Sequence, residues 1–434
     1  MDLLAFNLPL IVLLPFIGAP LTAWVASKNR LASAWAAAGI TLSALLLLLP
    51  AIEYPFANQT LLQGWSWIPS LGLDFAFRLD GLALLFVFMI LLIGLLVILY
   101  AAYYLSPSDS MGRFFSYMMM FMGSMLGIVL SENLIQLVIF WELTSLTSFL
   151  LISFWQYRQD ARDGARMALT ITGAGGLAML AGVLIIGNIV GSFNLTDVLA
   201  SGNMIREHAL YIPALVLILL GVFTKSAQFP FHFWLPHAMA APTPVSAYLH
   251  SATMVKAGIF MLARLFPVLS GTDAWMWLVG TAGMVTMVLG AYTALFKHDL
   301  KGLLAYSTIS HLGLITLLFG FSTQLAAVAA IFHIINHATF KASLFMVAGI
   351  IDHECGTRDM RKVNGLLKYM PHTAVLAMIA ASAMAGVPLL NGFLSKEMFF
   401  QQALEATDHH ILSWATPIIV TFGAIFSVAY SLRF

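Results

Sequence analysis

The sequence predicts an all-α membrane protein that crosses the bilayer about thirteen times. Of its 434 residues, 61% are hydrophobic and only 9% are charged, and the mean hydropathy is +0.92. Soluble domains carry about 25% charged residues, so this composition lies outside their range. Apolar runs of about 20 residues, the length a helix needs to span a bilayer, recur along the whole chain. The net charge of +1 offers no basic surface for nucleic acid.

A sliding hydropathy window of about 20 residues places the membrane spans. They fall near residues 3–25, 31–50, 82–104, 114–131, 133–154, 165–190, 210–229, 244–267, 275–296, 302–320, 324–350, 372–401 and 411–433. The last span reaches Phe434 with almost no tail, so we expect the chain to be one part of a longer protein. His409 and His410 directly precede this span and are expected in a solvated outer loop.

Residues 51–81 are predicted to form an extracellular hairpin rather than a span. Apolar and polar residues alternate from Leu71 to Arg78, which is the period of a strand. The hairpin belongs to an N-terminal three-helix segment, residues 1–112. We expect the remaining chain to form a first repeat at residues 113–268 and a second repeat at residues 269–434.

Basic residues in the predicted loops orient the spans. With the N-terminus outside, twelve basic residues fall in cytoplasmic loops, and only Arg78 and Arg206 fall in outer loops. Cytoplasmic loops of membrane proteins are enriched in Lys and Arg, so this asymmetry predicts an outside N-terminus. The twelve are Lys28, Arg30, Arg113, Arg158, Arg162, Arg166, Lys297, Lys301, Arg358, Arg361, Lys362 and Lys368.

Two of the spans are predicted to be broken. The seventh is interrupted near residues 225–242, where Pro230 cannot donate to the helix ladder and further prolines follow. The twelfth is interrupted near residues 386–396, where the run AGVPLLNG at residues 385–392 comes just before Lys396. Broken helices five spans apart, each with a lysine, predict two inverted five-helix repeats made of spans four to eight and nine to thirteen.

Four lysines lie inside the apolar spans, and no arginine is found as deep; they are Lys225, Lys256, Lys341 and Lys396. Ionisable side chains in membrane spans cost at least ~2.5 kcal/mol each at mid-helix, and they mark ion or proton paths. A lysine in a low dielectric can lose its proton at accessible pH, whereas an arginine cannot. The choice of lysine therefore predicts a protein that handles protons.

Glu142 is the one acidic residue near the middle of a span. A carboxylate at that depth needs a cation beside it to stay charged, and Lys225 is the natural candidate. Pairing would hold Lys225 charged, and loosening the pair would release its proton, so the pair acts as a switch. The alternative is a static ion pair that locks two helices, although buried ion pairs stabilise proteins poorly.

Two further helices carry groups suited to a proton relay. His250 and Lys256 are six residues apart, about 9 Å along a helix, and point to different sides. His333, His337 and Lys341 follow at i, i+4 and i+8, which makes one stripe about 12 Å long. Such a row passes protons when water joins its members. A structural role as hydrogen-bonded interior residues is the alternative, above all for His250.

The pattern of these histidines is less suited to binding haem or a metal ion. Axial haem ligands approach opposite faces of the macrocycle, which His333 and His337, one turn apart on one helix, cannot do. Haem would need His250 or His311 from another helix. A metal at His333 and His337 is geometrically allowed, but no third ligand of suitable type is near in sequence. We therefore expect no metal and no cofactor. His232 and His237, beside the broken seventh span, could admit protons or cap exposed backbone.

Five motifs stand out along the chain: KSAQFPFHFWLPHAM at residues 225–239, APTPVSA at 241–247, LHSATMVKAG at 249–258, DLKGLLAYSTISH at 299–311 and NGFLSK at 391–396. They resemble the proton-translocating antiporter-like subunits of respiratory complex I, membrane-bound hydrogenases and Mrp-type multisubunit sodium/proton antiporters. The resemblance covers most of the chain. The fourth motif adds Lys301 and His311 as secondary candidates. The segment GIIDHECGTRD at 349–359 is most similar to the large A subunit of Mrp antiporters.

The resemblance implies a fold of fourteen helices in which each inverted repeat holds a broken helix and a half-channel. It implies that Glu142 and Lys225 pair in the first half-channel, that His250 and Lys256 bridge towards the second, and that Lys396 serves the exit side. The chain departs from the family in two respects. The large subunit of the family is far longer, and at least one of the fourteen helices is missing here.

The resulting hypothesis is a proton-translocating subunit that works with other membrane subunits to exchange sodium or potassium for protons in a prokaryotic inner membrane. It predicts a secondary transporter rather than an enzyme. An equivalent pump subunit of complex I (NADH-quinone oxidoreductase) or of a membrane-bound hydrogenase is the alternative, with its redox chemistry in partner subunits. A scaffold without transport is a third hypothesis, and it predicts that the intramembrane lysines tolerate leucine.

Overall fold

The computed structural model describes residues 7–71, 73–405 and 415–434. Helices make up most of this part of the chain, and its two strands form one antiparallel hairpin. The predicted first and last spans begin among residues that lie outside the described ranges. His409 and His410 lie outside them as well.

The N-terminal half contains α1 (Asn7–Lys28), α2 (Arg30–Leu48), α3 (Glu53–Phe56), β1 (Leu61–Ile68), β2 (Leu73–Leu79), α4 (Gly81–Tyr104), α5 (Met111–Leu130), α6 (Leu134–Ile152), α7 (Gln159–Val190), α8 (Leu195–Ala200), α9 (Gly202–Glu207) and α10 (Tyr211–Lys225). There follow α11 (Trp234–His237), α12 (Thr243–Ser251), α13 (Met254–Leu269), α14 (Asp273–Trp275), α15 (Thr281–Leu295), α16 (Leu300–Gly320), α17 (Gln324–Cys355), α18 (Leu366–Tyr369), α19 (Pro371–Ala385), α20 (Asn391–Glu405) and α21 (Ala415–Arg433).

The membrane-crossing segments are those that the sequence predicts. Among the described residues, 11 helices are long and apolar enough to cross a membrane, and two shorter apolar helices, α10 and α19, belong to the predicted broken spans. Each predicted span coincides with one of these segments. The prediction of an all-α polytopic membrane protein is confirmed.

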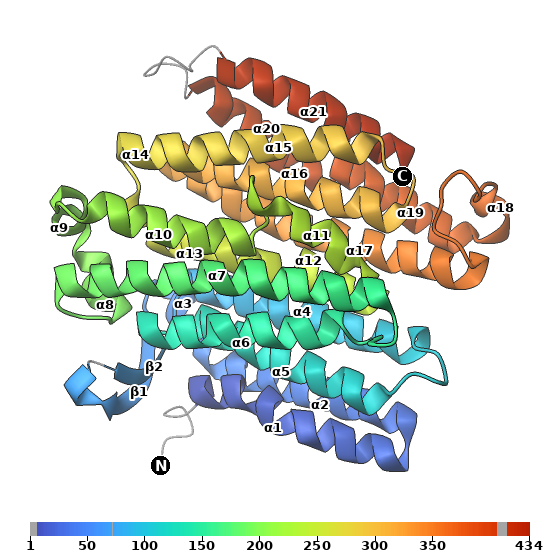
Figure 1. The fold of residues 1–434 in the computed structure, drawn as a ribbon, viewed down its shortest axis with the longest axis horizontal. Helices are drawn as coiled ribbons and strands as arrows, with labels where there is room; N and C mark the ends of the chain where they lie inside the picture. The colour runs from blue at the N-terminus through green and yellow to red at the C-terminus, as the bar shows by residue number, and fades with distance from the viewer. Residues whose placement is uncertain (1–6, 72, 406–414) are drawn as a thin grey trace.

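The long helices lie roughly parallel, and α1, α2 and α5 occupy one side of the molecule (Figure 1). α15, α16, α20 and α21 occupy the other side, and α7 and α10 lie between the two groups. The hairpin and the short helices α8 and α9 lie at one end of the bundle, and α18 lies at the opposite end. A path from α1 to α21 runs sideways through the bundle rather than along the helices.

Both predicted interruptions are present. α10 ends at Lys225, and the chain continues through Pro230 into short helical turns before α12. α19 ends at Ala385, where Gly386 adopts a left-handed conformation with φ of +85°, and α20 begins at Asn391. Each break thus lies beside a lysine. The assignment of these segments to two inverted repeats, and the division at residues 112 and 268, stay predictions.

A third interruption was not expected, because the sequence predicts one continuous span at residues 244–267. The helical segment breaks between α12 and α13, at Ala252 and Thr253. The Thr253 hydroxyl donates to the carbonyl oxygen of Tyr248, and the Ser251 hydroxyl donates to that of Ala247. Hydroxyls that bond backbone carbonyls in this way compete with the helix ladder. The break separates His250 from Lys256.

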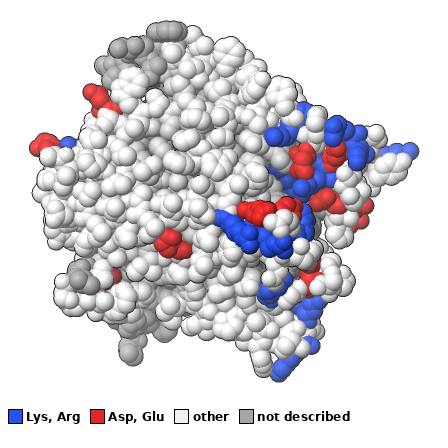
Figure 2. Space-filling model, viewed as in Figure 1, with Lys and Arg blue, Asp and Glu red and all other residues white. Residues whose placement is uncertain are grey.

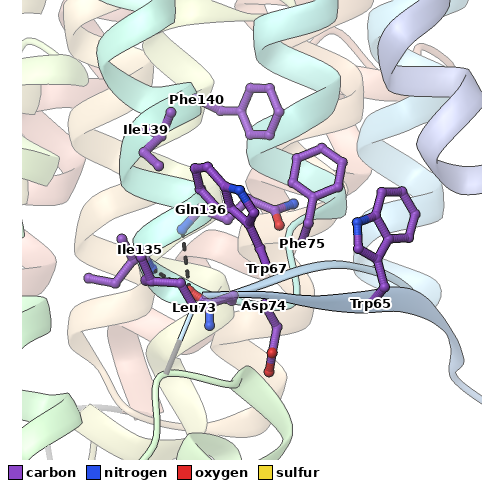
Figure 3. A pocket seen from close by; sticks show the side chains of 10 residues that line it. Trp65, Trp67, Leu73, Asp74, Phe75, Ile135, Gln136, Ile139 and Phe140 are labelled. Atoms are coloured by element: carbon purple, nitrogen blue, oxygen red, sulfur yellow. Dashed lines mark hydrogen bonds between the residues drawn. The ribbon is translucent and has the colours of Figure 1, made fainter. Parts of the chain in front are cut away.

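The β1–β2 hairpin lies within residues 51–81 and packs against the first turns of α6. The Gln136 side chain accepts a hydrogen bond from the Ala76 amide at 2.9 Å and donates one to the Ala76 carbonyl at 3.0 Å. Beside these contacts, a mainly apolar pocket of about 310 Å³ lies between the hairpin and α6. Trp67 lines it from the hairpin and Ile139 from α6 (Figure 3). The amide contacts fix the register of β2 against α6.

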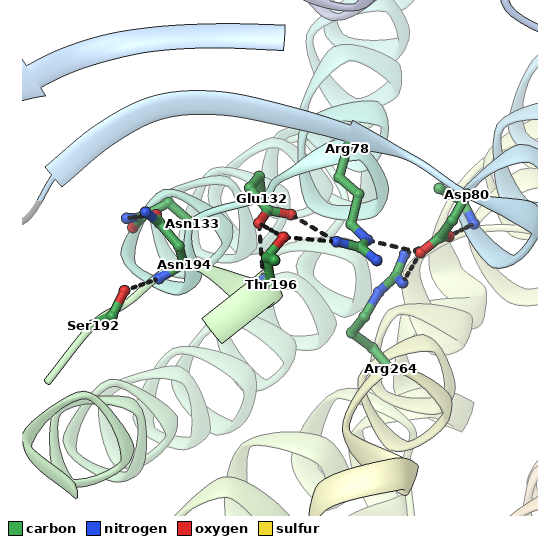
Figure 4. A network of polar contacts seen from close by, with 9 residues as sticks. Arg78, Asp80, Glu132, Asn133, Ser192, Asn194, Thr196 and Arg264 are labelled. Carbon is green, nitrogen blue, oxygen red and sulfur yellow. Dashed lines mark hydrogen bonds and ion pairs between the residues drawn. The ribbon is translucent and has the colours of Figure 1, made fainter. Parts of the chain in front are cut away.

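A network of charged side chains ties β2 to α13 (Figure 4). Asp80 caps the N-terminus of α4 by accepting a hydrogen bond from the Ala83 amide, and it forms ion pairs with Arg78 and Arg264. Arg78 also contacts Glu132 at 3.2 Å. Arg264 lies on the helix that carries Lys256, and its side chain is only 4% exposed. The network therefore holds that helix against the hairpin.

The Asp80→Asn substitution is expected to destabilise the protein by about 3–5 kcal/mol at pH 7, because it leaves the buried Arg264 without its partner. Burial raises the pKa of the Asp80 carboxyl, but the charge and hydrogen bonds of Arg264, with smaller contributions from Ala83 and Arg78, lower it well below its usual value. A carboxyl whose pKa is lowered on folding stabilises fully above its unfolded pKa of about 3.9. That stabilisation is lost as the pH falls from there towards the folded pKa.

Thermal unfolding in detergent at pH 7 and at pH 3 measures this effect. The difference between wild type and Asp80→Asn should shrink at the lower pH. The matched control is Asp163→Asn, which removes an exposed ion pair with Arg166 at 3.8 Å and should change stability by about 0–1 kcal/mol. Equal destabilisation by the two substitutions would contradict the assigned role of Asp80.

Candidate functional site

The predicted relay residues lie on helices that contact one another across the bundle. α6 and α10 both pack on α7, α10 packs on α13, α12 packs on α17, and α17 packs on α16 and α20. In chain order the residues are Glu142 on α6, Lys225 on α10, His250 on α12, Lys256 on α13, Lys301 and His311 on α16, His333, His337 and Lys341 on α17, and Lys396 on α20. All are buried except Glu142, which is half-buried.

Lys225 is fully buried at the end of α10 and faces α6. Its Nζ atom donates to the Ser145 hydroxyl at 2.7 Å and to the Trp141 carbonyl oxygen at 3.1 Å, and it lies 5.3 Å from the centre of the Trp141 ring. Glu142, the predicted partner, directly follows Trp141 on α6, and its carboxylate interacts electrostatically with Lys225. Neither hydrogen bond of Lys225 goes to Glu142. The structure thus places both residues where α10 meets α6, and Ser145 of α6 is the side chain that hydrogen-bonds the amine.

Glycines on α7 make room for the Glu142 carboxylate. A Cβ atom at Gly176 would lie 1.6 Å from the Oε1 atom of Glu142, and one at Gly175 would lie 1.8 Å from the Oγ1 atom of Thr224, next to Lys225. At Gly173, one turn away, a Cβ would be 3.9 Å from Oε2 of Glu142, which is an ordinary van der Waals distance. No hydrogen-bond partner for Oε1 is found in the described part of the chain. A side chain at position 176 would therefore exclude this oxygen from the place where it lies.

Lys256 links α13 to the helix that carries the histidine stripe. Its Nζ atom donates to the carbonyl oxygen of Ile334 at 3.0 Å. His250, on the other side of the α12–α13 break, packs between the rings of Trp234 and Phe345, with ring centres 6.4 and 6.2 Å away. Neither ring nitrogen of His250 has a hydrogen-bond partner among the described residues. The interior here contains polar groups that the protein's own side chains leave unpaired.

The stripe on α17 faces α16. His333 Nε2 lies 3.0 Å from Nδ1 of His311, and the His337 ring centre is 5.4 Å from that of His311. Lys341 hydrogen-bonds the hydroxyl of Ser307, one turn before His311 on α16. The structure therefore gives His311, a secondary candidate, a central position. No group of three potential metal ligands was found among the described residues.

Lys396 lies in the second turn of α20, the helix that follows the second break. Its Nζ atom donates to the Ala385 carbonyl oxygen at 2.9 Å and to the Ser427 hydroxyl of α21 at 3.1 Å. The carbonyl that it binds belongs to the last residue of α19, whose backbone the break leaves without a helical partner. The lysine thus satisfies the broken helix and contacts a further helix.

The other secondary candidates differ in burial. Lys301 is buried, and its amine donates to the Ala241 carbonyl oxygen at 2.7 Å, in the segment that follows the first break. His232 is half-buried and stacks on Phe229, with ring centres 6.0 Å apart. His237 is exposed. The structure brings Lys301 to the segment that contains both histidines, but it does not bring their rings into the buried row.

Several neighbours of the relay were missed by the sequence reasoning. Ser145 and Ser307 bind the amines of Lys225 and Lys341, and Gly176 positions Glu142. Each is a small residue in an apolar helix, where such residues are common at helix contacts. The one signal in the sequence was spacing, because Ser145 follows Glu142 by three residues and Ser307 precedes His311 by four.

Comparison with known proteins agrees with this architecture. Residues 131–424 match the family model described as NADH:quinone oxidoreductase/Mrp antiporter, TM, and residues 65–115 match one described as NADH-Ubiquinone oxidoreductase (complex I), chain 5 N-terminus. A protein of Rhizobium meliloti (strain 1021), named as the A/B subunit of a probable K(+)/H(+) antiporter, is 60% identical over 98% of this chain. The A subunit of the Na(+)/H(+) antiporter of Alkalihalophilus pseudofirmus is 50% identical over 84% of it.

A solved structure, that of the Mrp complex from Dietzia sp. DQ12-45-1b, contains a chain that matches 98% of this one with a TM-score of 0.93 and 39% identity. The alignments cover 43% and 48% of the two relatives and 46% of the Dietzia chain, so this chain spans about half their length. The first family model covers more than half of the present sequence. The chain therefore belongs to the NADH:quinone oxidoreductase/Mrp antiporter transmembrane family.

Proposed function

We propose that this chain is the proton-conducting part of the large A subunit of a multisubunit Mrp-type antiporter, which exchanges sodium or potassium for protons in a prokaryotic cell membrane. The observation that carries the proposal is the row of buried amines and imidazoles on successive, contacting helices. Such groups are costly in a membrane and mark proton paths. The names of the relatives, one for K(+)/H(+) and one for Na(+)/H(+), support exchange of a monovalent cation.

Protons would pass sideways along the row. Glu142 sets the charge state of Lys225, and Lys256 joins the first half of the row to the histidines of α17. His250 and His337 have no protein partner on either ring nitrogen among the described residues, so ordered water would connect them to their neighbours. Lys396 forms the far end. The two broken helices would each open a half-channel in one of two inverted repeats, at residues 113–268 and 269–434.

The chain would act with other subunits of the antiporter, and the cation would travel outside the described row, which contains one carboxylate. The charge distribution supports an outside N-terminus. Lys and Arg side chains gather at the end of the bundle that carries α18, and the opposite end shows few of them (Figure 2). Basic loops face the cytoplasm, so the α18 end would be the cytoplasmic one.

The single cysteine tests this orientation. Cys355 is exposed at the end of α17, on the side assigned to the cytoplasm. A membrane-impermeant maleimide is expected to label it in everted vesicles and not in right-side-out vesicles. Labelling of the detergent-solubilised complex serves as the control for accessibility. Labelling in right-side-out vesicles alone would reverse the orientation.

Exchange in everted vesicles tests the function. In everted vesicles from wild-type cells, addition of Na+ or K+ should collapse a preformed pH gradient. Vesicles from cells that lack this protein should keep the gradient, and supplying the full-length protein should restore the response. The measurement uses a pH-sensitive dye and a gradient formed without NADH. Restoration only in the presence of NADH would favour the alternative, a redox-driven pump of the complex I type.

A further inference from the structure

A continuous line of hydrogen bonds joins Lys396 to the α17 histidines through α21. Lys396 Nζ donates to the Ser427 hydroxyl at 3.1 Å, and that hydroxyl donates to the Tyr430 hydroxyl at 3.1 Å. The Tyr430 hydroxyl lies 3.1 Å from His311 Nε2, and His311 Nδ1 lies 3.0 Å from His333 Nε2. The contacts that involve nitrogen lie within the normal hydrogen-bond range of about 2.7–3.2 Å, and the contact between the two hydroxyls lies just above the usual limit of about 3.0 Å. Lys396 on α20 and His311 on α16 are thus connected through α21 without a gap.

The line can be polarised in one direction throughout. Tyr430 donates to His311 if Nε2 of His311 is unprotonated, and the proton on Nδ1 of His311 then points to His333. His333 Nδ1 in turn lies 2.9 Å from the Ser395 hydroxyl, which donates to the Gly392 carbonyl oxygen at 3.1 Å. One choice of tautomers therefore lets every group donate to the next, and this is the arrangement that a proton relay needs.

We propose that Ser427 and Tyr430 carry protons between Lys396 and the α17 histidines, an inference that rests on the proposed function. Starting from the Lys396 ammonium, an N–H bond breaks as an O–H bond forms on Ser427. Ser427 gives its own proton to Tyr430, Tyr430 gives its proton to His311 Nε2, and His311 gives the Nδ1 proton to His333 Nε2. Lys396 ends as a neutral amine and His333 as an imidazolium. Every other group keeps its charge and its number of protons.

Burial favours this route over one through water. Tyr430 is 0% exposed and Ser427 is 6% exposed, and both lie where α21 packs on α20 and α16. The cavity bordered by Lys396, His311 and Ser427 measures about 10 Å³, which is the lower limit for a single water molecule. A cavity of this size offers room for at most about one water molecule between Lys396 and His311, whereas the two hydroxyls already connect them.

The test compares exchange rates of the assembled antiporter in vesicles. Tyr430→Phe keeps the ring and removes only the hydroxyl, and it should lower the rate at least about tenfold, as should Ser427→Ala. Because both substitutions break one line, the double variant should be no slower than either single variant. Ser427→Thr, which keeps a hydroxyl, should retain exchange. Tyr211→Phe is the matched control, since its buried hydroxyl bonds the Leu269 carbonyl outside the relay.

The outcomes separate this inference from the proposed function. A rate for Tyr430→Phe within about twofold of that for Tyr211→Phe would overturn the inference, and so would losses that multiply in the double variant. Lys225→Ala is measured in the same vesicles. If Lys225→Ala stops exchange while Tyr430→Phe does not, only the α21 link is wrong. If Lys225→Ala also exchanges normally, the proposed function fails with it.

Discussion

Lys225→Ala is expected to lower cation/proton exchange by about 100-fold or more while the complex still assembles. The amine of Lys225 is fully buried and bridges α10 to α6 through Ser145 and the Trp141 carbonyl oxygen. Alanine at this position offers no group that takes up or releases a proton. The exchange rate in everted vesicles, divided by the amount of assembled complex in the same membranes, measures the effect.

Lys225→Arg separates proton transfer from charge. Arginine keeps the positive charge beside Glu142 but cannot give up its proton, so exchange should stay as low as in Lys225→Ala. Ser145→Ala removes a hydrogen-bond partner of the amine and leaves the amine itself, and we expect a smaller loss. Normal exchange by Lys225→Arg would show that Lys225 acts only through its charge.

Gly176→Ala is expected to lower exchange on the order of 10- to 100-fold with little effect on stability. The added methyl group would lie 1.6 Å from Oε1 of Glu142, so the carboxylate must move. The group that must move most is the flexible end of a side chain, and Trp141 Cδ1, at 3.1 Å, must give only slightly, so the fold can adjust at low cost. The position of the charge relative to Lys225 would still change, and displacements of about 1 Å at a reacting group are costly.

Gly173→Ala provides the matched control for this substitution. It makes the same change on the same helix and faces the same carboxylate, but at 3.9 Å, where the methyl group fits without displacement. Exchange rate and thermal stability are measured for both variants. Equal exchange rates for Gly173→Ala and Gly176→Ala would mean that the position of Glu142 does not matter, and a large fall in stability for Gly176→Ala would point to packing instead.

The membrane spans, the hairpin and both broken helices were predictable, because each has a cause within a short stretch of sequence. Spans follow from the length of apolar runs, and the hairpin follows from the alternation around Asp74. The second break follows from Gly386 and the residues after it, since a left-handed backbone favours glycine. The break at Thr253 has no proline or glycine beside it, so hydroxyl-to-carbonyl hydrogen bonds were its one local cause.

The candidate residues were also predictable, but their connections were not. Ionisable groups in apolar spans can be read directly from the sequence, and they include every lysine of the buried row. Which hydroxyl binds which amine depends on how distant helices pack. Ser427 and Tyr430 join Lys396 to His311 because α20, α21 and α16 meet. No pattern within α21 identifies this contact.

The central claim is that protons cross from one half of the row to the other, and Lys256 tests it most directly. Lys256 Nζ binds the Ile334 carbonyl oxygen and is the amine that joins α13 to the stripe-bearing helix. The purified complex, reconstituted with Lys256→Leu, should exchange at less than about a tenth of the wild-type rate. Lys362→Leu, which removes an exposed loop lysine, should exchange normally. Wild-type exchange by Lys256→Leu would contradict the lateral path.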